Sequence, residues 1–383
     1  MKAQLRRLAL LAGIGVAVFA MACSSDSDDD ADTTPAAGTP GAAATSEPVE
    51  ELVVGVIHVG SIKDNGYNQA MDIALQEMKA NVPGLKIIQA ENVPESADAE
   101  RVMENMINQG AKLIFPLSFG YLDPALNVAA KHPDVKFEHP AGGQLADNLG
   151  TFWSDTTAME YLMGIVAGST TKTNKLGWVI GFPIPNILTS INAFQLGAQS
   201  VNPDVTTQVI VNNAWVDPGK EAEAVNALAD AGVDVVTMIV DSPQTVVETA
   251  EKRGIMSIGF HCLCVQDAAG EGWLTGIGFT WGDLFTTFAE DVMAGTWKSE
   301  NNIGTLAQGY AAIAPYGSKV SADTQAKVEA AKAAIIDGSL NVFAGPITDN
   351  EGNVVIAEGE TGDIPTLLGS TDYLVAGVTG NID

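Results

Sequence analysis

The sequence has little positive charge and few cysteines. Its 383 residues include 19 Lys and Arg against 47 Asp and Glu, which gives a formal net charge of −28. A broad cationic surface for phosphates is therefore excluded, and we expect no nucleic-acid partner. Only 3 cysteines are present, too few for a disulfide scaffold or a multi-cysteine zinc module. Stability must come from packing.

Signatures of catalysis are also missing. The chain contains no Gly-x-Ser-x-Gly, no phosphate-binding Gly-x-x-x-x-Gly-Lys, no His-Glu-x-x-His and no strand-linked dinucleotide fingerprint. The cluster His261-Cys262-Leu263-Cys264 offers fewer ligands than structural zinc needs and spaces its cysteines too closely. We expect no metal, no cofactor and no enzymatic activity. Because a disulfide in so small a ring would be strained, Cys262 and Cys264 are expected to be reduced or loosely paired.

The chain does contain enough apolar material for substantial cores. Hydrophobic residues make up 46% of it and charged residues 17%, a globular composition. At about 150 residues per domain, the length indicates two domains.

The first residues are typical of an export signal. Residues 1–22 place basic side chains before an apolar run that is too short for a comfortable membrane span. The run ends at Ala20-Met21-Ala22-Cys23, which resembles the lipobox at which bacterial lipoproteins are cleaved and lipidated. We therefore predict a lipoprotein signal peptide at residues 1–22 and a lipidated Cys23. Ordinary signal cleavage near Ala22 is the alternative.

An acidic, flexible tether is predicted at residues 23–51. This stretch holds Asp and Glu among Ser, Thr, Pro, Gly and Ala, and it cannot form a core. The strong negative charge of the chain repels anionic lipid, so attachment to a membrane depends on the acyl anchor. We expect an exported protein that is lipid-anchored to the cell membrane, at its periplasmic or extracellular face.

The body of the chain alternates strand and helix patterns. Residues 52–57 form a continuous apolar run typical of a strand buried on both faces, and a helical pattern follows over residues 68–82. Further on, residues 85–89 and 113–116 predict strands on either side of a helix at 97–109. This alternation implies a parallel sheet.

Two halves of the chain match without gaps. Residues 85–88 align with 207–210, and Gly110 aligns with Gly232. The pattern predicts two similar α/β lobes, each with a doubly wound parallel sheet. Chance similarity between two strand-helix units is the alternative.

A hinge of three crossovers is expected between the lobes, near Trp153, after the strand that ends at Phe279, and around Asn302. The N-terminal lobe is assigned residues 52–152 plus 281–300, and the C-terminal lobe residues 153–280 plus 301–383. Because ligands bind outside the carboxyl ends of parallel strands, the facing lobes predict one shared cleft.

Aromatic, carboxylate and amide side chains recur at the predicted strand ends. They can stack on a flat ring and hydrogen-bond its edges, although any single aromatic can instead cover a lobe edge. Only Lys63 and Lys220 lie near these loops, which favours a neutral polar ligand. The candidate ligand-binding residues are Asp64, Tyr67, Asn68, Phe119, Tyr121, Trp153, Phe182, Trp215, Asp241, His261 and Trp281.

Several stretches of residues 53–343 resemble a known family. They include Asp64-Asn65-Gly66-Tyr67-Asn68-Gln69-Ala70, Gly181-Phe182-Pro183-Ile184-Pro185, Trp215-Val216-Asp217-Pro218-Gly219-Lys220-Glu221 and Gly232-Val233-Asp234-Val235-Val236. These motifs are similar to those of the basic membrane lipoprotein family of ABC-transporter substrate-binding proteins, whose fold is the type 1 periplasmic binding protein.

The resemblance implies a monomeric receptor that closes on a purine nucleobase or nucleoside and presents it to an ABC permease. Two departures put ribose recognition in doubt: Asp241-Ser242-Pro243 stands where nucleoside receptors carry a Gly-rich loop, and His261 stands where they often carry Asp. A free base such as adenine is therefore expected to fit better than a nucleoside. The alternatives are a receptor for a neutral sugar or another small polar solute, a chemosensory receptor, and an exported enzyme.

Overall fold

The computed structural model describes residues 51–382. The predicted signal peptide, Cys23 and the tether as far as residue 50 lie outside the described residues. Within residues 51–382, no helix is long and apolar enough to cross a membrane.

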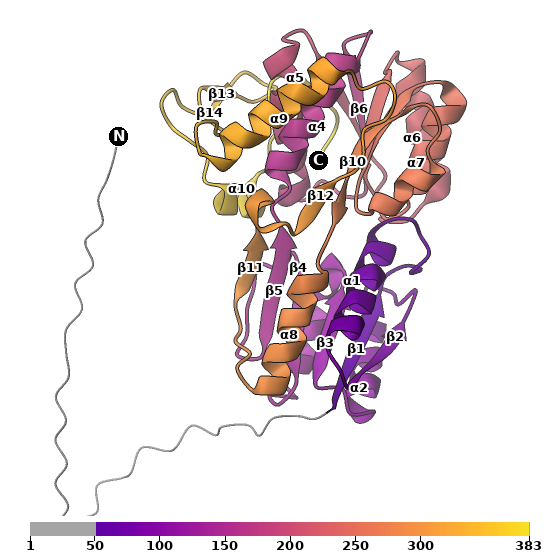
Figure 1. Cartoon of the computed structure of the whole chain (residues 1–383), viewed down its shortest axis with the longest axis vertical. Helices are drawn as coiled ribbons and strands as arrows, with labels where there is room; N and C mark the ends of the chain where they lie inside the picture. Colours follow the sequence, from indigo (N-terminus) through magenta and orange to yellow (C-terminus); the bar gives the residue numbers. More distant parts are fainter. Residues whose placement is uncertain (1–50, 383) are drawn as a thin grey trace, which may run out of the picture. The chain divides into compact units, whose positions relative to one another are not determined.

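The first lobe is built on a six-stranded parallel sheet with the order β11-β5-β4-β3-β1-β2 (Figure 1). Helices α1 and α8 pack against each other, and so do α2 and α3. The buried apolar residues form a larger and a smaller hydrophobic cluster. Two neighbouring residues of strand 113–117 belong to different clusters, Phe115 to the larger and Ile114 to the smaller. This alternation is the strand period of two, and it buries the sheet on both faces. The elements are β1 (Leu52–His58), α1 (Tyr67–Asn81), β2 (Leu85–Ala90), α2 (Ala97–Asn108), β3 (Leu113–Leu117), η1 (Phe119–Tyr121), α3 (Leu122–Ala129), β4 (Lys136–Pro140), β5 (Leu149–Ser154), α8 (Gly282–Ala294) and β11 (Asn301–Gly304).

The second lobe has a seven-stranded sheet with the order β12-β10-β9-β8-β6-β7-β15, in which only β12 is antiparallel to its neighbour. A small antiparallel pair, β13 and β14, lies outside it. The elements are α4 (Thr157–Thr170), β6 (Lys175–Ile180), α5 (Pro185–Val201), β7 (Thr206–Val211), α6 (Pro218–Asp230), β8 (Val235–Ile239), α7 (Pro243–Arg253), β9 (Met256–Gly259), η2 (Leu263–Ala268), β10 (Trp273–Phe279), η3 (Leu306–Gln308), β12 (Ala311–Ile313), α9 (Ala322–Ile336), β13 (Ile347–Thr348), β14 (Val354–Ile356), α10 (Ile364–Ser370) and β15 (Val378–Thr379).

The two sheets repeat one strand order, since β5-β4-β3-β1-β2 of the first corresponds to β10-β9-β8-β6-β7 of the second. Both sheets are doubly wound, and the expected fold class is confirmed. In each sheet, the strand that follows β1 or β6 in sequence lies on one side of it and the next strand after that lies on the other side. Folds of this kind leave a crevice for ligands at the point where the strand order reverses.

Proline fixes where several helices of the second lobe begin. Pro185, Pro218 and Pro243 each occupy a first helical position, in α5, α6 and α7. Proline is favoured there because its fixed φ suits the helix and its missing N–H is not needed. Helices α5 and α7 therefore start close after the carboxyl ends of β6 and β8, where the cleft was expected.

The expected lobe boundary at residue 301 is wrong. Strand β11 pairs in parallel with β5 of the first sheet, and Thr151 Oγ1 donates a hydrogen bond of 2.9 Å to Asn301 Oδ1. This pairing gives hydrogen-bond partners to the backbone groups at the edge of β5, so residues 301–304 belong to the first lobe. For the same reason β5 extends to Ser154, past the expected end at residue 152.

Three chain segments cross between the lobes: after β5, after β10 and between β11 and β12 (Figure 1). Ser154 joins them, because its Oγ donates to Tyr310 O at 2.9 Å and accepts from Trp281 Nε1 at 2.8 Å. The backbone N–H of Asp155 also donates to Gly304 O at 2.7 Å. The crossings are thus hydrogen-bonded to one another, and we call them the hinge.

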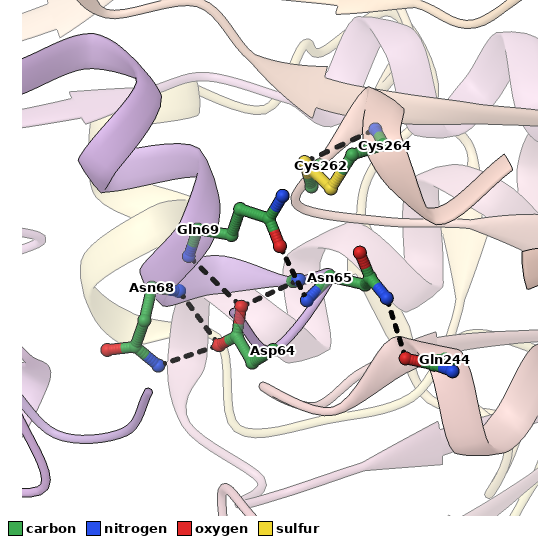
Figure 2. Close-up of a disulfide and its surroundings, with 8 residues drawn as sticks. Asp64, Asn65, Asn68, Gln69, Gln244, Cys262 and Cys264 are labelled. Atoms are coloured by element: carbon green, nitrogen blue, oxygen red, sulfur yellow. Dashed lines mark hydrogen bonds between the residues drawn. A yellow bond between two sulfur atoms is a disulfide. The ribbon is translucent and has the colours of Figure 1, made fainter. Parts of the chain in front are cut away.

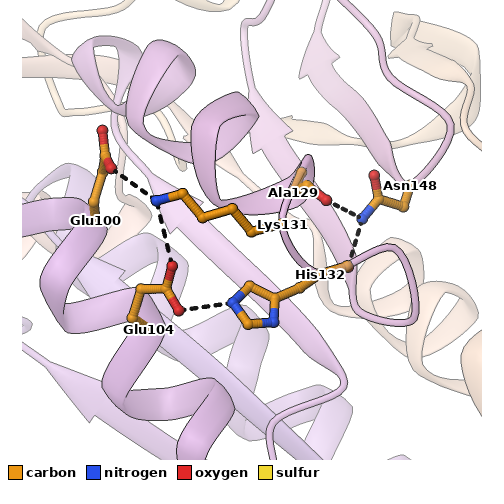
Figure 3. Close-up of polar contacts among 6 residues, drawn as sticks. All are labelled: Glu100, Glu104, Ala129, Lys131, His132 and Asn148. Atoms are coloured by element: carbon orange, nitrogen blue, oxygen red, sulfur yellow. Dashed lines mark hydrogen bonds and ion pairs between the residues drawn. The ribbon is translucent and has the colours of Figure 1, made fainter.

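A polar cluster ties the end of α3 to its surroundings (Figure 3). Asn148 Nδ2 donates to the carbonyls of Ala129 and His132 at 3.1 and 2.9 Å. His132 Nε2 lies 2.7 Å from Glu104 Oε2, and Lys131 Nζ lies 3.5 Å from Glu104 Oε1. These contacts join α3 to α2 and to the start of β5.

Candidate ligand-binding site

A cavity lies between the lobes at the carboxyl ends of strands from both sheets. Its empty volume is about 570 Å³ with the solvent at its mouth included. The lining residues are Tyr67, Ser118, Phe119, Pro140, Ala141, Trp153, Thr156, Ile184, Asn186, Ile187, Ser190, Trp215, Ile239, Asp241, Phe260 and His261.

Aromatic rings from both lobes form much of the wall. Tyr67, Phe119 and Trp153 come from the first lobe, and Trp215 and Phe260 from the second. Phe182 supports Trp215 from behind, with ring centroids 4.9 Å apart in an edge arrangement. A flat ligand can therefore be covered by rings that their neighbours hold in place.

Asp241 is the unpaired carboxylate of the cavity. It follows β8, it is only 4% exposed, and no described residue donates a hydrogen bond to its side chain. Burial, followed by the charges of Asp64, Glu95 and Glu221, raises the pKa of Asp241 well above its usual range. A buried acceptor without a partner is costly, so Asp241 is ready to accept a hydrogen bond from a ligand.

His261 follows β9, the strand next to β8, and also lines the cavity. It is 4% exposed, and neither ring nitrogen has a hydrogen-bond partner among the described residues. Burial lowers the pKa of His261 to about 3. The imidazole is therefore neutral at ordinary pH, with one donor and one acceptor nitrogen.

No lysine or arginine of residues 51–382 lines the cavity. Lys220 Nζ instead donates to Asn212 O at 3.0 Å and lies 3.6 Å from Asp217 Oδ2, while Lys63 is exposed. The site thus offers an anion no basic side chain.

Two predicted polar residues, Asp64 and Asn68, do not line the cavity. Asp64 Oδ1 accepts from the backbone of Gly66 and Gln69 at 2.8 and 3.0 Å, and Oδ2 accepts from the backbone and the amide of Asn68 at 3.0 and 2.8 Å (Figure 2). Asn68 Oδ1 in turn accepts from Gly60 N at 3.2 Å. Burial raises the pKa of Asp64, and these hydrogen bonds oppose the rise. The carboxylate is occupied in holding the start of α1.

Three predicted aromatic residues also lie behind the wall. The hydroxyl of buried Tyr121 donates to Val93 O, and Trp281 is fully buried with its ring stacked 4.1 Å from that of Phe279. Phe182 contacts Trp215 as described above. The structure therefore brings together Tyr67, Phe119, Trp153, Trp215, Asp241 and His261, and it places Asp64, Asn68, Tyr121, Phe182 and Trp281 outside the cavity.

The sequence interpretation missed the contribution of α5. Asn186, Ile187 and Ser190 line the cavity from the first turns of this helix. The signal was Pro185 after a strand, which marks a helix start. Most of α5 is buried, however, so the sequence pattern does not show which side faces a ligand.

The two lobes touch beside the cavity. Asn65 Nδ2 in the first lobe donates to Gln244 Oε1 in the second at 2.6 Å (Figure 2), and the rings of Tyr67 and His261 meet edge-on at 5.4 Å. A Cβ on Gly66 would lie 2.3 Å from Asp241 O, so only glycine permits this approach. The lobes are closed on the cavity.

The expectation for the cysteines is wrong, because Cys262 and Cys264 form a disulfide (Figure 2). The chain passes from extended backbone at Cys262 into η2, which brings the two Cα atoms to 5.1 Å. This separation lies within the usual Cα range for a disulfide.

Comparison with known proteins agrees with this geometry. The family model described as ABC transporter substrate-binding protein PnrA-like matches residues 51–342. A purine-binding protein of Brucella abortus is 40% identical over 88% of this chain and 95% of its own. A protein of Haloferax volcanii, provisionally named an ABC transporter glucose-binding protein, is 33% identical over 81% of this chain and 80% of its own.

A solved structure shares the fold. The ABC transporter solute-binding protein of Conexibacter woesei superposes with a TM-score of 0.62 at 24% identity, over 76% of this chain and 98% of its own.

Proposed function

Because the chain belongs to the family of PnrA-like ABC transporter substrate-binding proteins, we propose that it is a lipid-anchored receptor for a purine nucleobase or nucleoside. In this proposal the monomeric protein closes its lobes on the ligand and delivers it to a membrane permease. The family is one of binding proteins, so the chemistry required is recognition and release.

The observation that carries the ligand class is the free carboxylate of Asp241 among aromatic rings. Purines combine a flat, stackable face with N–H groups at their edge, which a carboxylate accepts. The absence of basic side chains from the described lining agrees with a neutral base and opposes a nucleotide. The similarity to the purine-binding protein of Brucella abortus supports the same ligand.

A neutral sugar is the second candidate, because the relative from Haloferax volcanii is named for glucose. A sugar carries many hydroxyl groups, each of which needs a partner once it is buried. Much of the lining is apolar, including Ile184, Ile187, Ile239 and Phe260, and its hydroxyl and amide groups come from Tyr67, Ser118, Thr156, Asn186 and Ser190. The cavity therefore favours the purine.

Calorimetric titration of the full mature chain with adenine, hypoxanthine, adenosine, inosine and glucose tests the proposal. Asp241→Asn should weaken purine binding by roughly ten-fold to a hundred-fold, since an NH2 donor replaces one of the two buried acceptor oxygens. Asp234→Asn is the matched control. Asp234 precedes the opposite end of β8 and accepts from Thr171 Oγ1 at 2.5 Å and Lys172 N at 2.7 Å, so its loss should leave affinity unchanged.

Binding of glucose without any of the purines would transfer the assignment to the sugar receptor. Equal affinity of Asp241→Asn and the wild type for every purine would remove this carboxylate from recognition.

The lipid anchor is proposed at Cys23, on the evidence of the basic start, the apolar run and the Ala-Met-Ala-Cys junction. Cys23→Ser should move most of the protein from the membrane fraction to the soluble fraction, because no acyl chain can be attached. Fractionation followed by immunoblotting measures the change. A variant that stays in the membrane fraction would contradict the anchor.

A further inference from the structure

We infer that His261 is the specificity-determining residue of the cavity, where its neutral imidazole hydrogen-bonds a ring nitrogen of the heterocycle whose N–H group is accepted by Asp241. The inference rests on the proposed purine ligand and names the atoms by which the same site selects it.

The two side chains stand at equivalent points of adjacent strands. Asp241 lies two residues beyond the end of β8, and His261 lies two residues beyond the end of β9. These strands are parallel neighbours, and neighbouring strands lie about 4.8 Å apart. Both residues also line the cavity. They therefore face one ligand from the same edge of the sheet.

The backbone of His261 is held in a conformation that histidine rarely adopts. Its φ is 72°, in the left-handed region that favours glycine and asparagine. The structure fixes it there: Phe279 N donates to His261 O at 2.9 Å, and the Cys262–Cys264 disulfide closes the turn that follows. Strain of this kind persists where the surroundings enforce it, and it is concentrated at ligand sites.

The ring itself is also fixed. Its centroid lies 4.6 Å from that of Phe260, 5.4 Å from Tyr67 and 5.6 Å from Phe279. None of these rings pairs with the imidazole nitrogens, which stay buried without a partner in the described chain. Two buried polar atoms in an otherwise packed ring are costly, and a ligand in the cavity can satisfy one of them. Packing thus fixes the ring of His261, and its two nitrogens are left to hydrogen-bond a ligand.

The chemistry of the pair suits the edge of a heterocycle. Ionised or protonated, the carboxyl of Asp241 has an oxygen that accepts a hydrogen bond, and the neutral imidazole of His261 can donate one. Together they match an edge with an N–H group beside a ring nitrogen that has a lone pair, as purines present. A sugar hydroxyl both donates and accepts, so it has no need of such a pair.

Titration with adenine, 1-deazaadenine, 3-deazaadenine and 7-deazaadenine tests the inference, because each analogue replaces one of adenine's three acceptor ring nitrogens by C–H. For the wild type, one analogue should bind about ten-fold more weakly than adenine. His261→Ala should bind adenine about ten-fold more weakly as well, and it should no longer distinguish that analogue from adenine. If hypoxanthine binds and adenine does not, the deaza analogues of hypoxanthine replace this series.

Two further variants separate recognition from backbone effects. Asparagine tolerates the left-handed region and keeps a donor and an acceptor, so His261→Asn should retain most of the affinity and the discrimination. His261→Gly relieves the backbone but offers no nitrogen, and it should behave like His261→Ala. Melting temperatures confirm that each variant is folded.

An equal loss of affinity for adenine and all three analogues in His261→Ala would overturn the inference, since packing alone predicts that result. A wild type that binds adenine and all three analogues equally would overturn it as well. Failure of the wild type to bind any purine is a different outcome, because it contradicts the proposed function itself.

Discussion

Burial, more than ion pairing, sets the protonation of the acidic residues around the cavity. Glu221 is fully buried, its Oε2 has no partner among the described residues, and its Oε1 accepts from Asp217 N at 3.2 Å. Desolvation raises the pKa of Glu221 to about 7 from an ordinary value of 4.5. The folded protein therefore holds a proton on Glu221 that the unfolded chain has already released.

The free energy of unfolding should fall as pH rises, through the contribution of Glu221. Between about pH 4.5 and 7 the folded state binds more protons than the unfolded state, so this contribution is complete below that window and lost above it. Glu221→Gln should reduce the loss of melting temperature between about pH 5 and pH 8, measured by thermal denaturation. Glu223→Gln, on the exposed side of the same helix, should keep the wild-type loss. An unchanged pH dependence in Glu221→Gln would contradict the prediction.

Residue roles were only partly predictable, as Asp64 and Asp241 illustrate. Both stand in a loop between a strand and a helix, and the sequence assigns both to ligand recognition. Asp64 meets four donors from its own loop and helix, whereas Asp241 meets none from the described residues. Helix capping and ligand binding use the same residue types at the same places, so only the donors distinguish them.

Among the elements, those with long apolar patterns were predicted closely. The run at residues 52–57 is β1 (Leu52–His58), and the helical pattern at 68–82 is α1 (Tyr67–Asn81). The pattern works there because burial on both faces of a parallel sheet demands a continuous apolar strand.

Short elements held by distant contacts could not be predicted in this way. Strand β11 is a short and partly exposed segment. It is a strand of the first sheet because it pairs with the open edge of β5. Near the C-terminus, Asn192 of α5 donates to Tyr373 O at 3.0 Å and accepts from Val375 N at 2.9 Å. Such contacts join residues far apart in the sequence, and no local periodicity reports them.

At the scale of the whole molecule, the hydrogen bond between Asn65 and Gln244 stabilises closure of the lobes. Asn65→Ala and Gln244→Ala should each speed ligand release about two-fold to ten-fold, because a hydrogen bond contributes roughly 0.5–1.5 kcal/mol and exists only in the closed form. Stopped-flow measurement of the protein's tryptophan fluorescence follows this rate, because Trp153 and Trp215 line the cavity.

The double variant provides the control for this contact. Removing both partners should speed release no more than removing one, because the two side chains act as a pair. Gln244 Nε2 also donates to Glu248 Oε1 at 2.6 Å, so Glu248→Ala measures the separate effect of that contact. Additive effects of Asn65→Ala and Gln244→Ala would show that the two side chains do not act on release through each other.

The hydrogen-bonded hinge limits the mechanical freedom of the lobes. A single connecting strand would let two bodies bend, twist and separate, whereas three crossings joined through Ser154 resist twisting and separation. We expect rotation about the hinge to be the main movement that remains. The rotation that admits a ligand must therefore also part Tyr67 from His261 and Asn65 from Gln244. The movement that admits the ligand is thus the same movement that breaks the closing contacts. When the lobes close again, the hinge returns both contacts to their places together.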